Sequence, residues 1–222
     1  MIIQWFGQSY FRIDTKNKVI ALDPYHENFT GLKPPRFKAD ILLISHNHDD
    51  HNNQDLILGK PFVMAGAGEI EVANIVIDGL MSYHDNQGGK LRGLNTIYLI
   101  RSEDMKLVFL GDLGEKRIKE ETLEKVANSD ILFIPVGGTY TLDAEEAVSV
   151  INQIEPKIVI PMHYQLPGLK IKLDSVDNFI RVFGKKPEYL NKLVMRRSQL
   201  PQNTQLVILQ ASTSINEENN LK

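Results

Sequence analysis

Short apolar runs, separated by polar and turn-forming residues, dominate the first half of the chain. They are rich in Ile, Val, Leu and Phe and are bounded by Gly, Asn, Asp and Pro, which is typical of β-strands joined by tight turns. The polar residues 102–105 lie between two such runs and predict a hairpin. The predicted strands cover residues 2–6, 10–14, 19–22, 41–45, 62–65, 74–78, 80–83, 96–101 and 106–110.

Helical periodicity enters in the second half, where it alternates with further apolar runs. Asp143 and Glu146 have the spacing of a capping box at the start of one helix. Asp174 and Gly184 are placed as the N-terminal and C-terminal caps of another helix. The predicted helices cover residues 116–127, 144–154 and 175–183, and the predicted strands cover 131–136, 157–160 and 204–209. Strands followed by alternating helices and strands predict an α/β fold.

The two halves of the chain share a pattern. Residues 19–23 followed by 39–46 (VIALD, then ADILLISH) resemble residues 107–112 followed by 129–136 (LVFLGD, then SDILFIPV) at nearly the same spacing. This similarity predicts two related β-rich halves whose strands end at a shared edge, where polar residues collect. The alternative is that buried strands resemble one another without any repeat.

Composition supports one well-packed domain. The chain has 222 residues, of which 42% are hydrophobic and 24% are charged, as in an ordinary globular protein. We expect a single domain over residues 1–211 and a frayed polar tail over 212–222. No run approaches the about 18 apolar residues of a membrane helix, and the first residues do not have the pattern of a secretion signal. The expected location is therefore cytoplasmic, with no membrane partner.

Charge and cysteine content exclude some classes of site. The formal net charge is -3 and the calculated isoelectric point is about 6.1, which argues against broad electrostatic binding to nucleic acid. The chain contains no cysteine, so it forms no disulfide. Any metal site must therefore use nitrogen and oxygen ligands.

The strongest chemical signal directly follows the predicted strand at 41–45. Residues 46–51 read His-Asn-His-Asp-Asp-His, an H-x-H-x-D-H pattern with three imidazoles and a carboxylate within six residues. Clustered imidazoles are poor core residues and repel one another when protonated, whereas a divalent cation binds them. His46 and His48 can point the same way from an extended segment, and Asp50 and His51 can address a second ion after a bend. The alternative, a solvated polar loop, explains the pattern less well.

This pattern resembles the metallo-β-lactamase superfamily, and within it the compact branch that includes the ascorbate-phosphate lactonase. The resemblance runs from about residue 1 to 170. It also covers His84 in Ser-Tyr-His-Asp, Asp112 in Leu-Gly-Asp and His163 in Ile-Pro-Met-His-Tyr, each after a predicted strand. It implies a four-layer αβ/βα sandwich with the site along one edge. Five of the six histidines fall on ligand positions of the family, and His26 does not.

The resemblance also implies roles for these residues. The first metal would be held by His46, His48 and His84, and the second by Asp50, His51 and His163, with Asp112 bridging both. Two ions about 3.5 to 4 Å apart would ionise the water between them near neutral pH and polarise the scissile bond. Asp50 could also orient that nucleophile. Zinc suits the ligand set, and manganese and iron are also compatible with it.

Further residues are candidates for substrate contacts. Lys90 and Arg92 lie in a glycine-rich segment soon after His84 and could bind an anionic substrate, although a solvated loop explains them equally well. Tyr140 follows the strand at 131–136 in a Gly-Gly-Thr-Tyr loop, and Tyr164 follows His163. Asp23, before Pro24, is either an ordinary turn residue, which we favour, or a partner of a ligand histidine.

These observations predict a metal-dependent hydrolase with a dinuclear site, acting on an ester, lactone or phosphoester bond of a small and anionic substrate. The alternative is a phosphodiesterase or ribonuclease, because two-metal chemistry also cleaves nucleic acid. A β-lactamase is less favoured because no secretion signal is seen. A non-catalytic metal-binding protein is disfavoured because purely structural sites usually close around one ion. The sequence does not predict the oligomeric state.

Overall fold

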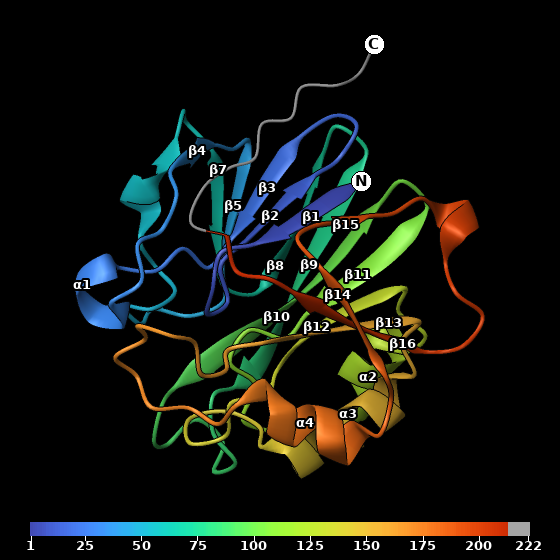
Figure 1. Cartoon of the computed structure of the whole chain (residues 1–222). Helices are drawn as coiled ribbons and strands as arrows, with labels where there is room; N and C mark the ends of the chain where they lie inside the picture. Colours follow the sequence, from blue (N-terminus) through green and yellow to red (C-terminus); the bar gives the residue numbers. More distant parts are fainter. Residues whose placement is uncertain (213–222) are drawn as a thin grey trace.

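The structure is a computed structural model that describes residues 1–212. Two β-sheets face each other, and the longer helices cover the outer face of the second sheet (Figure 1). Among the described residues, no helix is both long enough and apolar enough to cross a membrane. The predicted α/β sandwich is confirmed, and its two sheets bring the ends of distant strands together.

The first sheet has six strands in the order β15-β1-β2-β3-β5-β7. Its strands are β1 (Ile2–Trp5), β2 (Phe11–Asp14), β3 (Val19–Leu22), β5 (Ile41–Ile44), β7 (Phe62–Ala65) and β15 (Leu193–Val194). Strands β1, β2 and β3 form an antiparallel meander, after which β5 and β7 run parallel to β3.

The second sheet has eight strands in the order β14-β16-β13-β12-β11-β10-β9-β8. Its strands are β8 (Gly68–Val72), β9 (Ile75–Tyr83), β10 (Leu94–Ser102), β11 (Met105–Phe109), β12 (Ile131–Pro135), β13 (Ile158–Met162), β14 (Pro187–Leu190) and β16 (Gln205–Leu209). Strands β9, β10 and β11 are again an antiparallel meander, followed by parallel β12 and β13. The runs at 74–78 and 80–83, which we predicted as two strands, are one continuous strand, β9.

Hydrogen bonds support the predicted repeat. Asp40, just before β5, donates its N–H to Val19 O and accepts the Val19 N–H on its carboxylate, each at 2.9 Å. Asp130, just before β12, does the same with Lys106 at 2.8 and 2.9 Å. The carbonyl of each aspartate then accepts the first N–H of the next parallel strand, from Phe62 or Ile158. The two halves therefore share strand order, strand direction and the aspartate hydrogen bonds at the start of their parallel strands.

Helices and short elements cover both sheets. The helices are α1 (Glu27–Thr30), α2 (Glu120–Val126), α3 (Ala144–Ile154) and α4 (Val176–Phe183); short elements are β4 (Phe37–Lys38), η1 (Gln54–Leu56), β6 (Ile57–Leu58) and η2 (Arg197–Gln199). The capping box of α3 is confirmed, and Gly184 ends α4. Ser175, rather than Asp174, caps α4, because its side chain accepts the Asp177 N–H. Helix α2 begins later than predicted, at Glu120.

The outer layer on the first sheet is built from short elements instead of long helices. Ile41 and Leu43 of β5 pack in the main core between the sheets, whereas Leu42 and Ile44 pack in a second cluster with Phe37. Strand β5 is therefore buried on both faces, which explains its uninterrupted apolar sequence. The predicted tail at 212–222 lies outside the described residues except for Ser212, whose N–H donates to Trp5 O at 3.0 Å.

Tyr98 ties the two sheets together near the edge that carries the polar residues. It lies on β10, is fully buried, and its hydroxyl is 2.7 Å from Ile44 O and 2.9 Å from Met64 O in the first sheet. The same oxygen accepts the Gly66 N–H at 3.2 Å. One side chain therefore contacts three backbone groups at the edge of the opposite sheet, two carbonyls that compete for its single hydroxyl proton and one N–H.

We predict that Tyr98→Phe lowers the free energy of unfolding by about 1–3 kcal/mol, because buried backbone groups lose their partner. Urea denaturation of matched metal-loaded samples measures the change. Tyr189→Phe is the control, because Tyr189 is 57% exposed on β14, and it should change the stability by less than about 0.5 kcal/mol. Equal urea midpoints for Tyr98→Phe and the parent chain would contradict the proposal that the Tyr98 hydroxyl stabilises the contact between the two sheets.

Candidate metal centre

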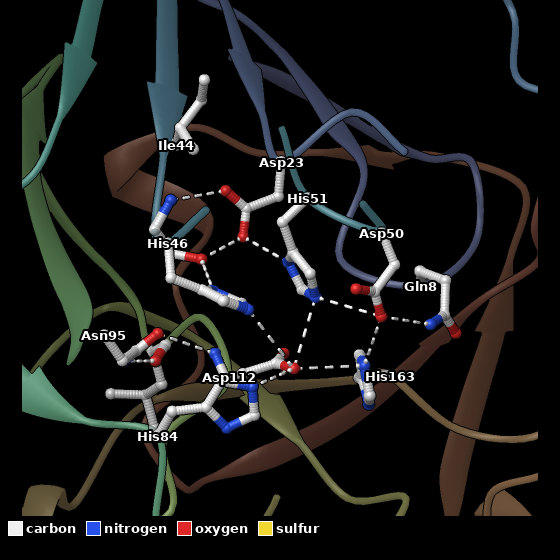
Figure 2. Close-up of polar contacts among 12 residues, drawn as sticks. Gln8, Asp23, Ile44, His46, Asp50, His51, His84, Asn95, Asp112 and His163 are labelled. Atoms are coloured by element: carbon white, nitrogen blue, oxygen red, sulfur yellow. Dashed lines mark hydrogen bonds and ion pairs between the residues drawn. The ribbon is translucent and has the colours of Figure 1, made fainter. Parts of the chain in front are cut away.

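The histidines and aspartates singled out in the sequence meet at one edge of the sandwich (Figure 2). Each follows the end of a strand: Asp23 follows β3, His46 follows β5, His84 follows β9, Asp112 follows β11 and His163 follows β13. His48, Asp50 and His51 come from the loop after β5. Because parallel strands of the two related halves end at the same edge, residues far apart in sequence converge there.

One group of potential ligands consists of His46, His48 and His84, whose ring nitrogens lie within 4.8 Å of one another. The His46 ring centroid lies 4.6 Å from that of His48 and 4.7 Å from that of His84. His46 and His84 are buried, whereas His48 is exposed. This arrangement leaves one side of the group open to solvent.

A second group consists of Asp50, His51, Asp112 and His163, which offer ligand atoms that are also within 4.8 Å of one another. Asp50 Oδ2 lies 3.5 Å from both His51 Nε2 and His163 Nε2. The two rings are nearly parallel, with centroids 5.6 Å apart. Both imidazoles are almost fully buried, while the side chain of Asp50 keeps 12% of its surface exposed.

Asp112 belongs to the second group but also faces the first. Its Oδ2 is 3.3 Å from His51 Nε2 and 3.3 Å from His163 Nε2. The same oxygen is 3.4 Å from His84 Nε2 and 4.0 Å from His46 Nε2. One carboxylate oxygen therefore faces four imidazoles that belong to both groups.

Asp23 orients two of these imidazoles. It is fully buried, and its Oδ2 accepts the Nδ1–H of His51 at 2.8 Å. Ser45 donates its hydroxyl to the same oxygen, so its Oγ accepts from His46 Nδ1 at 2.9 Å. Both Nδ1 atoms are thereby engaged, and both Nε2 atoms face the cluster. Our preferred interpretation of Asp23 as an ordinary turn residue was wrong, because its carboxylate is directed inward.

Asn95 on β10 fixes the turn that presents Asp112. Its Oδ1 accepts the Asp112 N–H at 2.9 Å, and its Nδ2 donates to Leu110 O at 2.9 Å. Between these two residues, Gly111 has a φ of +54°, and a Cβ there would lie 2.4 Å from Asn95 Oδ1. The turn therefore requires glycine, and Asn95 holds both of its ends.

Burial and charge set the protonation of the cluster. Burial lowers the pKa of His46 well below its usual value, and the neighbouring His51 lowers it further. Burial also disfavours the charge on His51, but Asp112 and Asp50 outweigh this effect and raise its pKa well above normal. For Asp112, burial is outweighed by the charges of His163 and His51, which lower its pKa.

The chemistry of this donor set fits metal ions. His46 Nε2, His51 Nε2, His163 Nε2 and Asp112 Oδ1 are buried and have no hydrogen-bond partner among the described residues. Unpaired buried polar atoms are costly, and here they converge on the same point. Neutral imidazoles and carboxylates are ligands of zinc, manganese and iron, so the cluster can hold metal.

Two of the predicted substrate residues, Arg92 and Tyr140, meet between the loops that follow β9 and β12, which we call the rim. The Arg92 guanidinium lies over the Tyr140 ring, 5.3 Å from its centroid, and its Nη2 is 3.4 Å from Thr139 O. Lys90 is exposed on the same loop as Arg92.

Tyr164 was predicted wrongly, because it is 4% exposed and packs in the main core with its ring 5.0 Å from Trp5. His26, which had no predicted role, is half-buried beside α1 and donates its N–H to Asp49 O.

Sequence reasoning missed Asp85, which organises the rim loop. The Asp85 carboxylate accepts four backbone N–H groups at 2.8–3.0 Å, from Gln87, Gly89, Leu91 and Arg92. Burial opposes its ionisation, but these amides lower the pKa of Asp85 to about 2. An aspartate before a glycine-rich segment is the available signal for such a turn. Asn95, Ser45 and Gln8, whose Nε2 is 3.4 Å from Asp50 Oδ2, carried no comparable sequence signal.

Comparisons with known proteins agree with this geometry. A family model described as the beta-lactamase superfamily domain matches residues 2–163. A UPF0173 metal-dependent hydrolase of Staphylothermus marinus is 30% identical over 192 residues, which cover 73% of this chain and 83% of that protein.

Solved structures give the same result. A Thermotoga maritima protein assigned to the zinc-dependent hydrolases of the metallo-β-lactamase superfamily is 31% identical, with a TM-score of 0.78 over 94% of this chain and 97% of that chain. A Parabacteroides distasonis protein assigned to the metal-dependent hydrolases is 21% identical, with a TM-score of 0.63 over 94% and 93% of the two chains. The second likeness supports the fold alone.

We predict that Asp112→Ala weakens metal binding and abolishes turnover, while the chain stays folded. Metal binding weakens because the variant lacks the carboxylate oxygen that faces both groups. The chain stays folded because the variant no longer buries a charged carboxylate, whose desolvation is costly. Chelator competition measures the affinity, and circular dichroism measures the fold. Asp49→Ala is the control, because Asp49 is exposed in the same loop as Asp50 and belongs to neither group. Near-normal metal affinity and activity in Asp112→Ala would show that Asp112 has been misassigned.

Proposed function

The chain belongs to the metallo-β-lactamase superfamily and is a metal-dependent hydrolase, and from this premise we propose that it works with two divalent ions. In this proposal, it hydrolyses an ester, lactone or phosphoester bond in a small, anionic substrate. The observation that carries the proposal is the position of Asp112 Oδ2, at 3.3–3.4 Å from histidines of both ligand groups. A carboxylate so placed can be shared by two ions.

The proposed ligand sets follow the two groups. The first ion is held by His46, His48 and His84, and the second by Asp50, His51 and His163, with Asp112 shared between them. When bound, such a pair of ions lowers the pKa of water and stabilises the negative charge that develops on the substrate. Zinc is the proposed metal because the donors are mainly imidazoles, and manganese and iron are accepted by the same donors.

The chain's own groups then divide the remaining work. Asp50 is the reachable carboxylate, because 12% of its side chain is exposed, against 2% for Asp112. It accepts a hydrogen bond from the attacking water and so fixes the direction of attack. Asp23 and Ser45 keep His51 and His46 from rotating, because each holds an Nδ1 atom. The ligand nitrogens are therefore directed inward before substrate binds.

The rim supports recognition of a negative charge on the substrate. Arg92 and Lys90 lie on the loop that follows ligand His84, and the Asp85 carboxylate holds that loop through four amides. Arg92 also bridges to the loop after β12 through Thr139 and Tyr140. A guanidinium fixed in this way binds a carboxylate or phosphate at little entropic cost.

We predict that each chain binds two metal ions. Elemental analysis of protein purified without chelator and reloaded with zinc or manganese should approach two equivalents. Dialysis against a chelator should remove hydrolytic activity, and readdition of metal should restore it. Full activity with saturation at one equivalent would refute the two-ion mechanism.

The bond and substrate class are tested by a screen of the metal-loaded protein against lactones, carboxylic esters, phosphodiesters and single-stranded RNA. We expect hydrolysis of small anionic esters, lactones or phosphoesters, and no activity in the Asp112→Ala control. Cleavage of RNA alone would overturn the small-molecule proposal and favour the ribonuclease alternative.

We expect the double variant Lys90→Ala and Arg92→Ala to raise KM for anionic substrates about tenfold to a hundredfold, with unchanged metal content. This range corresponds to the loss of about 1.5–3 kcal/mol from charge-assisted hydrogen bonds. A matched control removes the same charges on α2 and α4, through Lys125→Ala and Arg181→Ala. Steady-state kinetics with anionic and neutral analogues measures the effect. Equal changes in KM for anionic and neutral analogues would show that the loop has a purely structural role.

A further inference from the structure

Gln8 lies in the loop between β1 and β2, and its side chain points at Asp50 (Figure 2). Its side chain is fully buried, and its Nε2 donates to Asp50 Oδ2 at 3.4 Å. That oxygen is the atom of Asp50 that also faces His51 and His163. Gln8 therefore contacts the ligand oxygen of the second group itself.

The backbone of Gln8 is connected to the same group. Its carbonyl accepts the His163 N–H at 3.1 Å and the Trp5 indole N–H at 2.9 Å. Gln8 has a φ of 47° and His163 a φ of 53°, so both residues are held in the left-handed region that disfavours ordinary side chains. Two strained residues from distant loops are joined here by one hydrogen bond, and strain of this kind collects at functional sites.

The side chain of Gln8 is poorly suited to a purely structural role. Its Oε1 is buried and has no hydrogen-bond partner among the described residues. Its single bond, to Asp50, is long for a bond to a carboxylate. An apolar side chain of similar size would avoid the cost of burying an amide with an unmet carbonyl. The contact between the Gln8 amide and the Asp50 carboxylate therefore explains why a glutamine occupies this buried position.

We propose that Gln8 is a positioning residue of the second ligand group, which orients Asp50 through its side-chain amide and His163 through its backbone carbonyl. This inference rests on the two-ion function proposed above and names one more residue that function needs. The amide restrains the Asp50 carboxylate, whose ligand oxygen would otherwise turn toward solvent through its exposed face. The Gln8 carbonyl fixes the backbone from which His163 projects. Two ligands of this group, Asp50 and His163, are thus set from one loop.

The test separates the amide from the backbone. Gln8→Leu removes the amide but keeps the carbonyl that accepts from His163 and Trp5. We expect the affinity for one of the two equivalents of metal, the one held by the second ligand group, to fall about tenfold to a hundredfold, as when other partners of metal ligands are removed. The other equivalent should keep its affinity within about threefold. Chelator-competition titrations with zinc measure both steps directly and need no substrate.

Thermal unfolding of chelator-treated protein provides the second measurement. Because Gln8→Leu removes a poorly satisfied buried amide, its melting temperature should be equal to or above that of the parent chain. The matched control is Gln153→Leu on α3, which loses bonds to Lys116 O, Ser149 O and the Ile118 N–H. It should melt earlier and bind both equivalents normally. A structural role for Gln8 would produce the behaviour of the control instead.

Each outcome decides one point. If the parent chain binds only one ion, the two-ion function fails, whatever Gln8 does. If the parent binds two ions and Gln8→Leu binds both with unchanged affinity, the function stands and the role of Gln8 is refuted. If Gln8→Leu does not fold, Gln8→Asn replaces it, since Asn tolerates a positive φ and withdraws the amide by one methylene. Normal binding of both equivalents by Gln8→Asn would then refute the proposal.

Discussion

A buried negative charge surrounded by imidazoles is the constraint around which this edge of the molecule is built. The side chain of Asp112 is 2% exposed, and an ionised carboxylate at such a position is very costly unless positive charge compensates it. Four histidines face its Oδ2, yet they cannot all be protonated, because burial lowers the pKa of His46 and His84. Bound metal ions would resolve this conflict, since they neutralise the carboxylate and use the imidazoles in their neutral form.

The two halves of the sandwich supply this arrangement from opposite sides. In the first half, the parallel strands β3 and β5 deliver Asp23 and His46, and in the second half β11 and β13 deliver Asp112 and His163. Asp40 sets the start of β5 against β3, and Asp130 sets the start of β12 against β11 in the same way. Tyr98 then joins the sheets close to β5. The proposed ligands at these strand ends are therefore placed by strand register, whereas His48, Asp50 and His51 come from the loop after β5.

The sequence predicted those parts of the molecule that local patterns determine. Apolar runs marked most strands of both sheets, and the capping box of α3 was placed correctly. The loop after β5 was recognised because three histidines stand close together. Edge strand β15 was missed because it has only two residues, and edge strand β8 was missed because its side chains are exposed or only partly buried. Strand β9 was divided because Gly79 interrupts its apolar pattern.

Residues that act through tertiary contacts were beyond sequence reasoning. The roles of Gln8, Asn95 and Ser45 depend on which backbone group or carboxylate the fold places opposite them, and no spacing rule encodes this. Tyr164 shows the converse error. Its adjacency to His163 suggested a shared role, but the left-handed backbone at His163 turns the ligand into the cluster and leaves the next side chain in the core.

Substrate specificity can change on this scaffold without disturbing the proposed metal ligands. The contacts that hold the ligands differ from the contacts that hold the rim loop. The ligands are held by Asp23, Ser45 and Asn95, all buried. The rim loop is held by Asp85, whose four amide bonds involve only the backbone of residues 87–92. Side chains on that loop can therefore vary while its shape is kept, so a shared fold and ligand set do not identify the substrate. In this chain the loop carries Arg92, stacked on Tyr140 across the rim, which is the contact on which the proposal of an anionic substrate depends.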